Sequence, residues 1–150
     1  MPSCKVEEII PASAQRVFDL VHDYERRLEW DTLLRAAYIE PPFKAADKDV
    51  VTVCKGRWMV GGIAMRTVYV SFRPGRTAAV RLLDPVLFFE TFAASIRHFD
   101  IEHGGSTVIY HFNFTSRPQF LRPVLDPLMM LVLRAETRKR LRSLRRYFTA

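Results

Sequence analysis

Four polar side chains in the middle of the chain could act together in a binding or catalytic site: Arg66, Glu90, His98 and Tyr110. The strand registers expected here place all four on faces that otherwise carry apolar residues, and ligand pockets combine apolar walls with a few convergent polar groups. Arg66 could hold a carboxylate or an enolate-like oxygen, while His98 and Tyr110 could donate to a carbonyl or act as general acid and base. The alternative is structural: the four side chains face solvent at strand ends or satisfy one another, with Glu90 and Arg66 as an ion pair.

Other kinds of catalytic or cofactor site have no matching pattern in the sequence. The four histidines lack the HxH or HExxH spacing of metal ligands, so no metal is expected. Neither Gly-Gly pair is followed by the helix and lysine of a phosphate-binding loop, and we expect no cofactor. Cys4 and Cys54 lie far apart without a CxxC motif, which favours two buried thiols in a reducing compartment. No catalytic residue is assigned.

Positive charge is concentrated near the end of the chain. The formal net charge is +7, and one basic run holds seven Arg or Lys residues: Arg134, Arg138, Lys139, Arg140, Arg142, Arg145 and Arg146. A solvated helix face is the simplest interpretation. Peripheral contact of Arg138, Lys139, Arg142, Arg145 and Arg146 with an anionic membrane is the alternative. Nucleic acid is not expected as a partner, because the run lacks interleaved aromatic residues that would stack on bases.

The composition is that of a globular chain with one core. The 150 residues are 49% hydrophobic and 26% charged, which excludes disordered, collagen-like and low-complexity chains. No apolar run approaches the roughly 18–20 residues of a membrane-spanning helix, and no secretory signal is evident. We therefore expect a cytoplasmic protein that is a monomer or a weak homodimer.

Turn signals divide most of the chain into strands. A strand is predicted over 4–10, a helix over 14–22 that begins at Ser13, and a second short helix over 24–34 with Leu28 and Trp30 turned inward. Further strands are predicted at 35–40, 49–57, 63–73, 76–83, 89–101 and 106–116. The short connections require antiparallel pairing, because a parallel crossover needs a dozen or more residues.

Two hairpin registers follow from matching apolar faces. A loop of residues 103–105 pairs Ile96 with Phe112 and His98 with Tyr110, and a loop of residues 73–75 pairs Val70 with Ala78 and Arg66 with Leu82. The opposite face then carries residues expected to form a solvated outer surface: Tyr69, Arg97, His111 and Asn113. If the choice of face is wrong, this second set lines the pocket instead.

The chain ends in a long helix, predicted over 127–147 with Asp126 as its cap. Residues 128–133 are apolar on every side, which indicates burial on more than one face or contact with something apolar besides the sheet. The apolar residues expected to line a cavity between helix and sheet are Val68, Val70, Phe92, Ile96, Phe112, Phe114, Leu128, Met129 and Val132.

The opening of the chain carries a motif of apolar residues at helical spacing. It reads Ile10-x-Ala12-Ser13-x-x-x-Val17-Phe18-x-Leu20-Val21-x-Asp23, followed by Trp30, and it resembles the polyketide cyclase/dehydrase and lipid-transport proteins, which are grouped with START domains and birch pollen allergens. The family more often has Pro where this chain has Ser13. The resemblance implies one START-like helix-grip domain over 1–150, of class α+β. In such a domain a curved seven-stranded antiparallel sheet surrounds a long C-terminal helix, two short helices follow the first strand, and an apolar cavity lies between sheet and helix.

Three functions fit these features. The leading one is binding, with or without transport, of an apolar small molecule such as a lipid, an isoprenoid quinone or a polyketide, with affinity from apolar burial. One alternative is a polyketide aromatase/cyclase-like enzyme that orients its substrate in the same cavity. The other is a non-enzymatic partner or chaperone that uses the C-terminal helix as an interface.

Overall fold

The computed structural model describes residues 2–57 and 63–149, and its strands form one antiparallel sheet. The strands are β1 (Ser3–Ile10), β2 (Leu34–Ile39), β3 (Val51–Gly56), β4 (Ala64–Arg73), β5 (Thr77–Leu82), β6 (Phe89–Asp100) and β7 (Ser106–Ser116). Their spatial order is β1-β7-β6-β5-β4-β3-β2, so β1 forms one edge of the sheet, next to β7, and β2 forms the other. The predicted strands and their antiparallel pairing are confirmed. The predicted turn at 61–62 lies outside the described residues.

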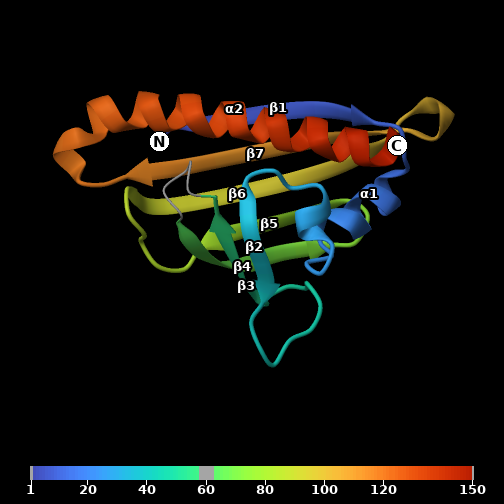
Figure 1. Cartoon of the computed structure of the whole chain (residues 1–150), viewed down its shortest axis with the longest axis horizontal. Coiled ribbons are helices and arrows are strands. Elements are labelled where there is room, and N and C mark those ends of the chain that lie inside the picture. Colours follow the sequence, from blue (N-terminus) through green and yellow to red (C-terminus); the bar gives the residue numbers. More distant parts are fainter. Residues whose placement is uncertain (1, 58–62, 150) are drawn as a thin grey trace.

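One long helix, α2 (Arg122–Thr149), runs along the sheet beside β1 and β7 (Figure 1). Its 28 residues correspond to about 42 Å. The helix begins five residues before the predicted Pro127, directly after a 3-10 turn, η4 (Gln119–Leu121). Asp126 is therefore no cap. It accepts a hydrogen bond from the Ser116 hydroxyl instead, and Pro127 is tolerated because it removes only one hydrogen bond near the start of the helix.

The segment after β1 is less helical than predicted. Helix α1 (Ala14–Val21) begins as expected, with the Ser13 hydroxyl accepting from the Arg16 amide. The second helix is a single 3-10 turn, η1 (Arg27–Glu29). Asp23 and Asp31 each accept a hydrogen bond from a backbone N–H two residues later, an arrangement that competes with helix formation. Trp30 is buried as predicted, but Leu28 is half exposed, so its predicted inward orientation is wrong.

The β6–β7 hairpin keeps its predicted faces in a different register. Ile96 pairs with Tyr110, and His98 pairs with Val108, because the loop spans 101–105 instead of 103–105. Each strand residue therefore meets a partner two positions from the predicted one. A shift of two residues leaves every side chain on the same side of the sheet.

The β4–β5 hairpin reverses the predicted face of β4. Phe72 pairs with Ala78 and Tyr69 pairs with Val80, because an irregularity of the β-bulge type lies between Tyr69 and Ser71. A bulge adds one residue to one strand, and one residue is enough to exchange the two faces. Tyr69 therefore points into the molecule and is almost completely buried. The predictions that Tyr69 faces outward and Val70 inward are both wrong.

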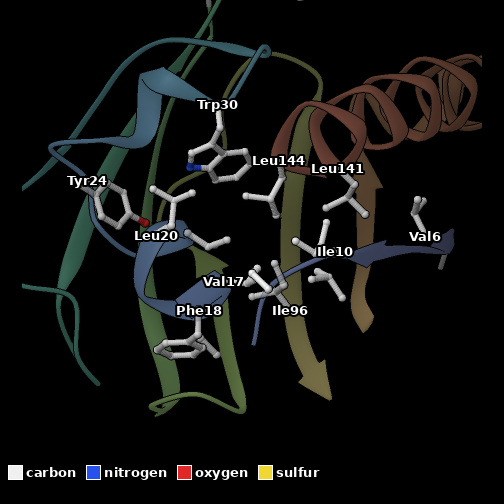
Figure 2. Packing of buried hydrophobic residues seen from close by; sticks show 14 of the residues in the cluster. Val6, Ile10, Val17, Phe18, Leu20, Tyr24, Trp30, Ile96, Leu141 and Leu144 are labelled. Carbon is white, nitrogen blue, oxygen red and sulfur yellow. The ribbon is translucent and has the colours of Figure 1, made fainter. Parts of the chain in front are cut away.

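The core fills the space between the sheet, α1 and the second half of α2. Figure 2 shows Leu141 and Leu144 of α2 meeting Ile10, Val17 and Trp30 there. A second apolar cluster lies under the first half of α2, with Phe89 buried and Phe112 and Phe114 fully buried. Within residues 2–57 and 63–149, no helix combines the length and the apolar content needed to cross a bilayer.

Candidate functional site

An inner cavity of about 60 Å³ lies between the sheet and the second half of α2. Apolar side chains from α1, β5, β6 and α2 form much of its wall: Val21, Ala78, Val80, Ala94, Ile96 and Leu141. Polar side chains reach the same cavity from the η1 segment, two strands and α2: His22, Tyr24, Arg27, Tyr69, Tyr110 and Arg140. This is the mixture of apolar wall and convergent polar groups that ligand sites share.

A buried cluster of three charges stands at this cavity. The guanidinium of Arg140 donates to both oxygens of Asp31, with Nε–Oδ1 at 3.0 Å and Nη2–Oδ2 at 2.9 Å. Arg27 donates from Nε to Asp31 Oδ2 at 2.9 Å and from Nη1 to the Val21 carbonyl at 3.2 Å. All three residues are at most 8% exposed. One carboxylate therefore serves two guanidinium groups that come from distant parts of the chain.

The cluster carries one unit of net positive charge inside the protein. Burial alone would raise the pKa of Asp31, but Arg140 and Arg27 outweigh it, and the pKa lies below its ordinary value. Burial would lower the pKa of each guanidinium, yet Asp31 outweighs it and both pKa values are raised. All three groups are thus ionised at neutral pH. Aromatic rings partly balance the excess, since Arg27 lies 5.1 Å from the Trp30 ring centroid and Arg140 lies 5.4 Å from that of Tyr110.

Each arginine keeps one donor nitrogen available. Among the described residues, Arg27 Nη2 and Arg140 Nη1 make no hydrogen bond. The other two nitrogens of each guanidinium donate to Asp31 or to the Val21 carbonyl. Both residues line the inner cavity. An oxygen placed in the cavity can therefore meet donors that carry a positive charge, and such hydrogen bonds are about twice as strong as neutral ones.

A chain of neutral hydroxyl groups lies beside the charges. The Tyr69 hydroxyl is 2.7 Å from His22 Nδ1 and 3.0 Å from the Tyr24 hydroxyl, and Tyr24 donates onward to Thr52 at 3.4 Å. Burial raises the pKa of both phenols and, with smaller effects of Arg27 and His98, lowers the pKa of His22 well below its ordinary value. His22 Nε2 is buried without a partner among the described residues. These groups are uncharged at neutral pH and can donate to or accept from a ligand oxygen.

An outer hollow of about 700 Å³ adjoins the inner cavity. It lies between α1 and the connection from β2 to β3, and apolar side chains supply part of its wall: Phe18, Ala37, Ile39, Phe43, Ala46 and Phe72. His22 and Tyr24 line both spaces, so these two side chains separate them. The outer hollow has the volume of a small-molecule site, whereas the inner cavity has room for only a small polar group.

The structure separates the four polar residues singled out in the sequence. Tyr110 lines the inner cavity. His98 is 3% exposed and packs against Phe18, away from the cavity, with neither ring nitrogen bonded within the described part of the chain.

Arg66 and Glu90 do not face the cavity. Arg66 lies on the outer face of β4, where it pairs with Glu40 and Asp84, and Glu90 is exposed next to a register shift in β6. The predicted inward orientation of these two residues is wrong, because irregularities in β4 and β6 change which side chains face inward.

The predicted apolar lining divides in a similar way. Ile96 lines the inner cavity, while four residues belong to the second cluster under the first half of α2: Phe92, Phe112, Phe114 and Met129. Val68 and Val70 lie on the outer side of β4, beyond the bulge, and Leu128 and Val132 face solvent on α2. The predicted cavity-facing orientation of these last four is wrong. The last two belong to residues 128–133, a stretch of α2 that is apolar on all sides and can turn only one side to the sheet.

The basic run on α2 is exposed with one exception. Arg138, Lys139, Arg142, Arg145 and Arg146 are exposed as predicted, but Arg140 is buried against Asp31. A signal for this was present, because Arg140 falls three or four residues from Thr137 and Leu144 on the inward stripe. The spacing of Arg27 and Asp31 by four residues was a second signal, since such pairs meet on one side of a helical turn.

Comparison with known proteins agrees with this architecture. Residues 1–149 match the family described as polyketide cyclase / dehydrase and lipid transport. The Zhui aromatase/cyclase from Streptomyces sp. R1128 superposes with a TM-score of 0.79 at 13% identity, over 95% of this chain and 90% of that chain. A START superfamily protein from Mycobacterium smegmatis gives 0.77 at 10% identity, over 98% and 97%. Ara h 8.0201 gives 0.72 at 10% identity, over 99% and 97%.

These likenesses establish the fold. At such low identities they carry no information on the ligand of this chain, and no curated protein matches it. The predicted helix-grip fold, with its curved sheet and long C-terminal helix, is confirmed.

Proposed function

Because the chain belongs to the polyketide cyclase/dehydrase and lipid transport family, the family that its opening motif predicted, we propose that it binds an apolar small molecule carrying an anionic or carbonyl oxygen. The oxygen lies in the inner cavity at Arg27 and Arg140. The apolar body of the ligand extends past His22 and Tyr24 into the outer hollow.

The observation that carries this proposal is the unequal charge count at the cavity wall. Two buried guanidinium groups face a single carboxylate, and an unbalanced buried charge is costly. A carboxylate or enolate oxygen on the ligand would balance the charge and use the two remaining donor nitrogens. Affinity for the rest of the ligand would come from apolar burial, at about 25 cal/mol per Å² before ordering costs.

Titration calorimetry with decanoate and decanol tests the proposal, since the two probes share a tail and differ in the head group. We expect decanoate to bind at least about tenfold more tightly than decanol, as a charged hydrogen bond contributes about 1.5–3 kcal/mol. In Arg27→Met this preference disappears, while decanol affinity changes less than about threefold. The variant keeps Asp31 and Arg140 as a balanced pair, so we expect it to fold.

Arg66→Met is the matched control, because it removes an exposed arginine from the outer face of the sheet. A decanoate preference that survives in folded Arg27→Met, or that is lost equally in Arg66→Met, contradicts the proposal. Mass analysis of a polyketide-like ketone recovered from the same protein separates binding from turnover. An unchanged mass supports a carrier, and loss of water supports the aromatase/cyclase alternative.

A further inference from the structure

Helix α2 has a continuous outward stripe in addition to its buried one. Exposed residues recur every three or four positions along its whole length, which places them on one face of the helix. The outward stripe consists of Val124, Leu128, Leu131, Val132, Ala135, Arg138, Lys139, Arg142 and Arg146. Its first five residues are apolar and its last four are basic, so the composition changes once along the helix.

The apolar half of the stripe continues onto neighbouring turns. Phe120 in η4 is 79% exposed, and Val124 and Leu131 are each 68% exposed. The turn between β5 and β6 presents Leu87 and Phe88, which are about half exposed. Hydrogen bonds from Arg117 to the carbonyls of Leu87 and Phe88, at 2.7 and 2.9 Å, fasten this turn to the end of β7 just before η4.

These residues gather at one end of the molecule. Figure 1 shows the start of α2 and the β5–β6 turn at the same end of the sheet. We call this surface the apolar end. Large apolar side chains exposed together mark an interaction surface rather than ordinary scatter.

The basic half of the stripe is free of acidic neighbours on its own helix face. The two acids of α2, Asp126 and Glu136, are half-buried and lie off the outward stripe. Within the described part of the chain, no ion pair involves Arg138, Lys139, Arg142 or Arg146, whereas the adjacent Arg145 pairs with Glu8. Four cations thus point to solvent directly beyond an apolar surface.

We propose that this face of α2 docks on an anionic lipid bilayer. The apolar end inserts among the acyl chains near the interface, and the four cations contact lipid phosphates. A helix that lies in the interface presents apolar residues to the acyl region and cations to the head groups, and both interactions contribute to its binding. A second copy of the chain fits this face less well. A parallel pair of α2 helices would oppose like charges, and an antiparallel pair that overlaps along the whole stripe would place each apolar half on basic side chains.

Vesicle sedimentation tests the docking surface. We expect the protein to sediment with vesicles that contain phosphatidylglycerol, and much less with vesicles of phosphatidylcholine alone or at high salt. The double variant Arg142→Gln/Arg146→Gln should lower partitioning onto anionic vesicles roughly 10- to 30-fold. Leu128→Ser/Leu131→Ser should lower it about tenfold, and this loss should persist at any salt concentration because it is not electrostatic.

Matched controls come from the outer face of the sheet. Arg81→Gln/Arg97→Gln makes the same change in net charge at exposed positions, and Val70→Ser/Phe99→Ser removes apolar side chains of similar exposure. Both controls should keep at least about half of the wild-type partitioning. If a control lost as much partitioning as its matched α2 variant, the loss would reflect net charge or apolar surface in general. That result would overturn the proposal.

Two other results would also overturn it: equal binding to both lipid compositions, or no binding to either. Measurement of the molar mass by light scattering tests whether a second copy of the chain occupies this face. A concentration-dependent dimer that Leu128→Ser/Leu131→Ser abolishes would assign this face to a second copy of the chain instead of a bilayer. All the substituted side chains are exposed, so loss of folding does not confuse these outcomes.

Discussion

At the scale of single residues, two core histidines predict how the stability of the protein responds to mild acid. His22 and His98 both pack against Phe18, with ring centroids 4.4 and 5.4 Å from it. Burial lowers the pKa of His98 to about 4, and neither of its ring nitrogens has a partner among the described residues. The ring is therefore neutral in the folded protein at neutral pH and packs as an aromatic side chain.

This burial predicts a loss of stability in mild acid. The unfolded chain takes up a proton on His98 near pH 6.5, whereas the folded chain does so only near pH 4. The free energy of unfolding therefore falls as the pH drops between these values, by about 3 kcal/mol for His98 alone. In His98→Phe this part of the fall should disappear, as urea denaturation at a series of pH values would show. Some slope remains because the pKa of His22 is also lowered.

His103→Asn is the control for this prediction. His103 lies in an exposed turn in the left-handed backbone region, which asparagine tolerates. We expect this variant to keep the wild-type dependence on pH. If His98→Phe and His103→Asn both keep it, His98 does not control the acid response.

Residue-scale prediction from the sequence failed where one backbone irregularity decides the face. Val68 and Val70 were matched to the apolar residues of the next strand, and that match favoured the wrong face of β4, since both lie on its outer side. The bulge after Tyr69 cannot be read from such a match, because both faces of this strand carry apolar side chains. Arg140 was missed for a different reason. A buried arginine requires an acidic partner, and Asp31 lies 109 positions earlier in the chain.

At the scale of elements, Asp31 ties the segment after α1 to the long helix. It pairs with Arg27 from the η1 turn and with Arg140 from α2, and its side chain also accepts from the Leu33 amide. The segment contains only one turn of 3-10 helix, so its position depends on such contacts more than on its own helical structure. These contacts place Arg27 and Tyr24 at the inner cavity.

Asp31→Asn should therefore destabilise the protein strongly. Loss of the carboxylate charge leaves two buried guanidinium groups without a counter-ion, which costs about 3–5 kcal/mol. Chemical denaturation would measure the loss. Asp84→Asn, which removes the exposed partner of Arg66, is the control and should cost less than about 1 kcal/mol. In the wild type, ionised Asp31 contributes fully to the free energy of unfolding above the ordinary pKa of an aspartate. This contribution is lost as the pH falls from there through the folded-state pKa of Asp31, because that pKa is lowered. Equal effects of the two variants would contradict this account.

All seven strands of the described sheet could be predicted at this scale, and each of their ends is within two residues of the predicted one. Glycine, proline and aspartate mark the turns between them, and these residues act locally. The start of α2 and the extent of η1 could not be predicted in this way. Both depend on side-chain contacts with other parts of the chain, as Asp126 with Ser116 and Asp31 with Arg140 illustrate.

At the scale of the whole molecule, the two spaces differ in size and in chemistry. The inner cavity of about 60 Å³ carries the charged donors, and the outer hollow of about 700 Å³ offers the room that an apolar body needs. His22 and Tyr24 line both spaces. A ligand with a polar head in the inner cavity and an apolar body in the outer hollow would pass between the two spaces at these residues. The proposed docking surface on α2 is separate from both spaces, so substitutions can test the proposed membrane binding and the proposed ligand binding independently.

The most direct test of ligand binding is nitrogen-15 NMR of the arginine side chains during titration with decanoate. If the ligand oxygen lies in the inner cavity, the Nε–H signals of Arg27 and Arg140 should shift together, with one saturation curve, and decanol should leave them nearly unchanged. The signal of the exposed Arg66 serves as an internal reference and should stay in place. Saturable binding of decanoate without any shift of Arg27 and Arg140 would contradict the account, because the ligand oxygen would then lie elsewhere.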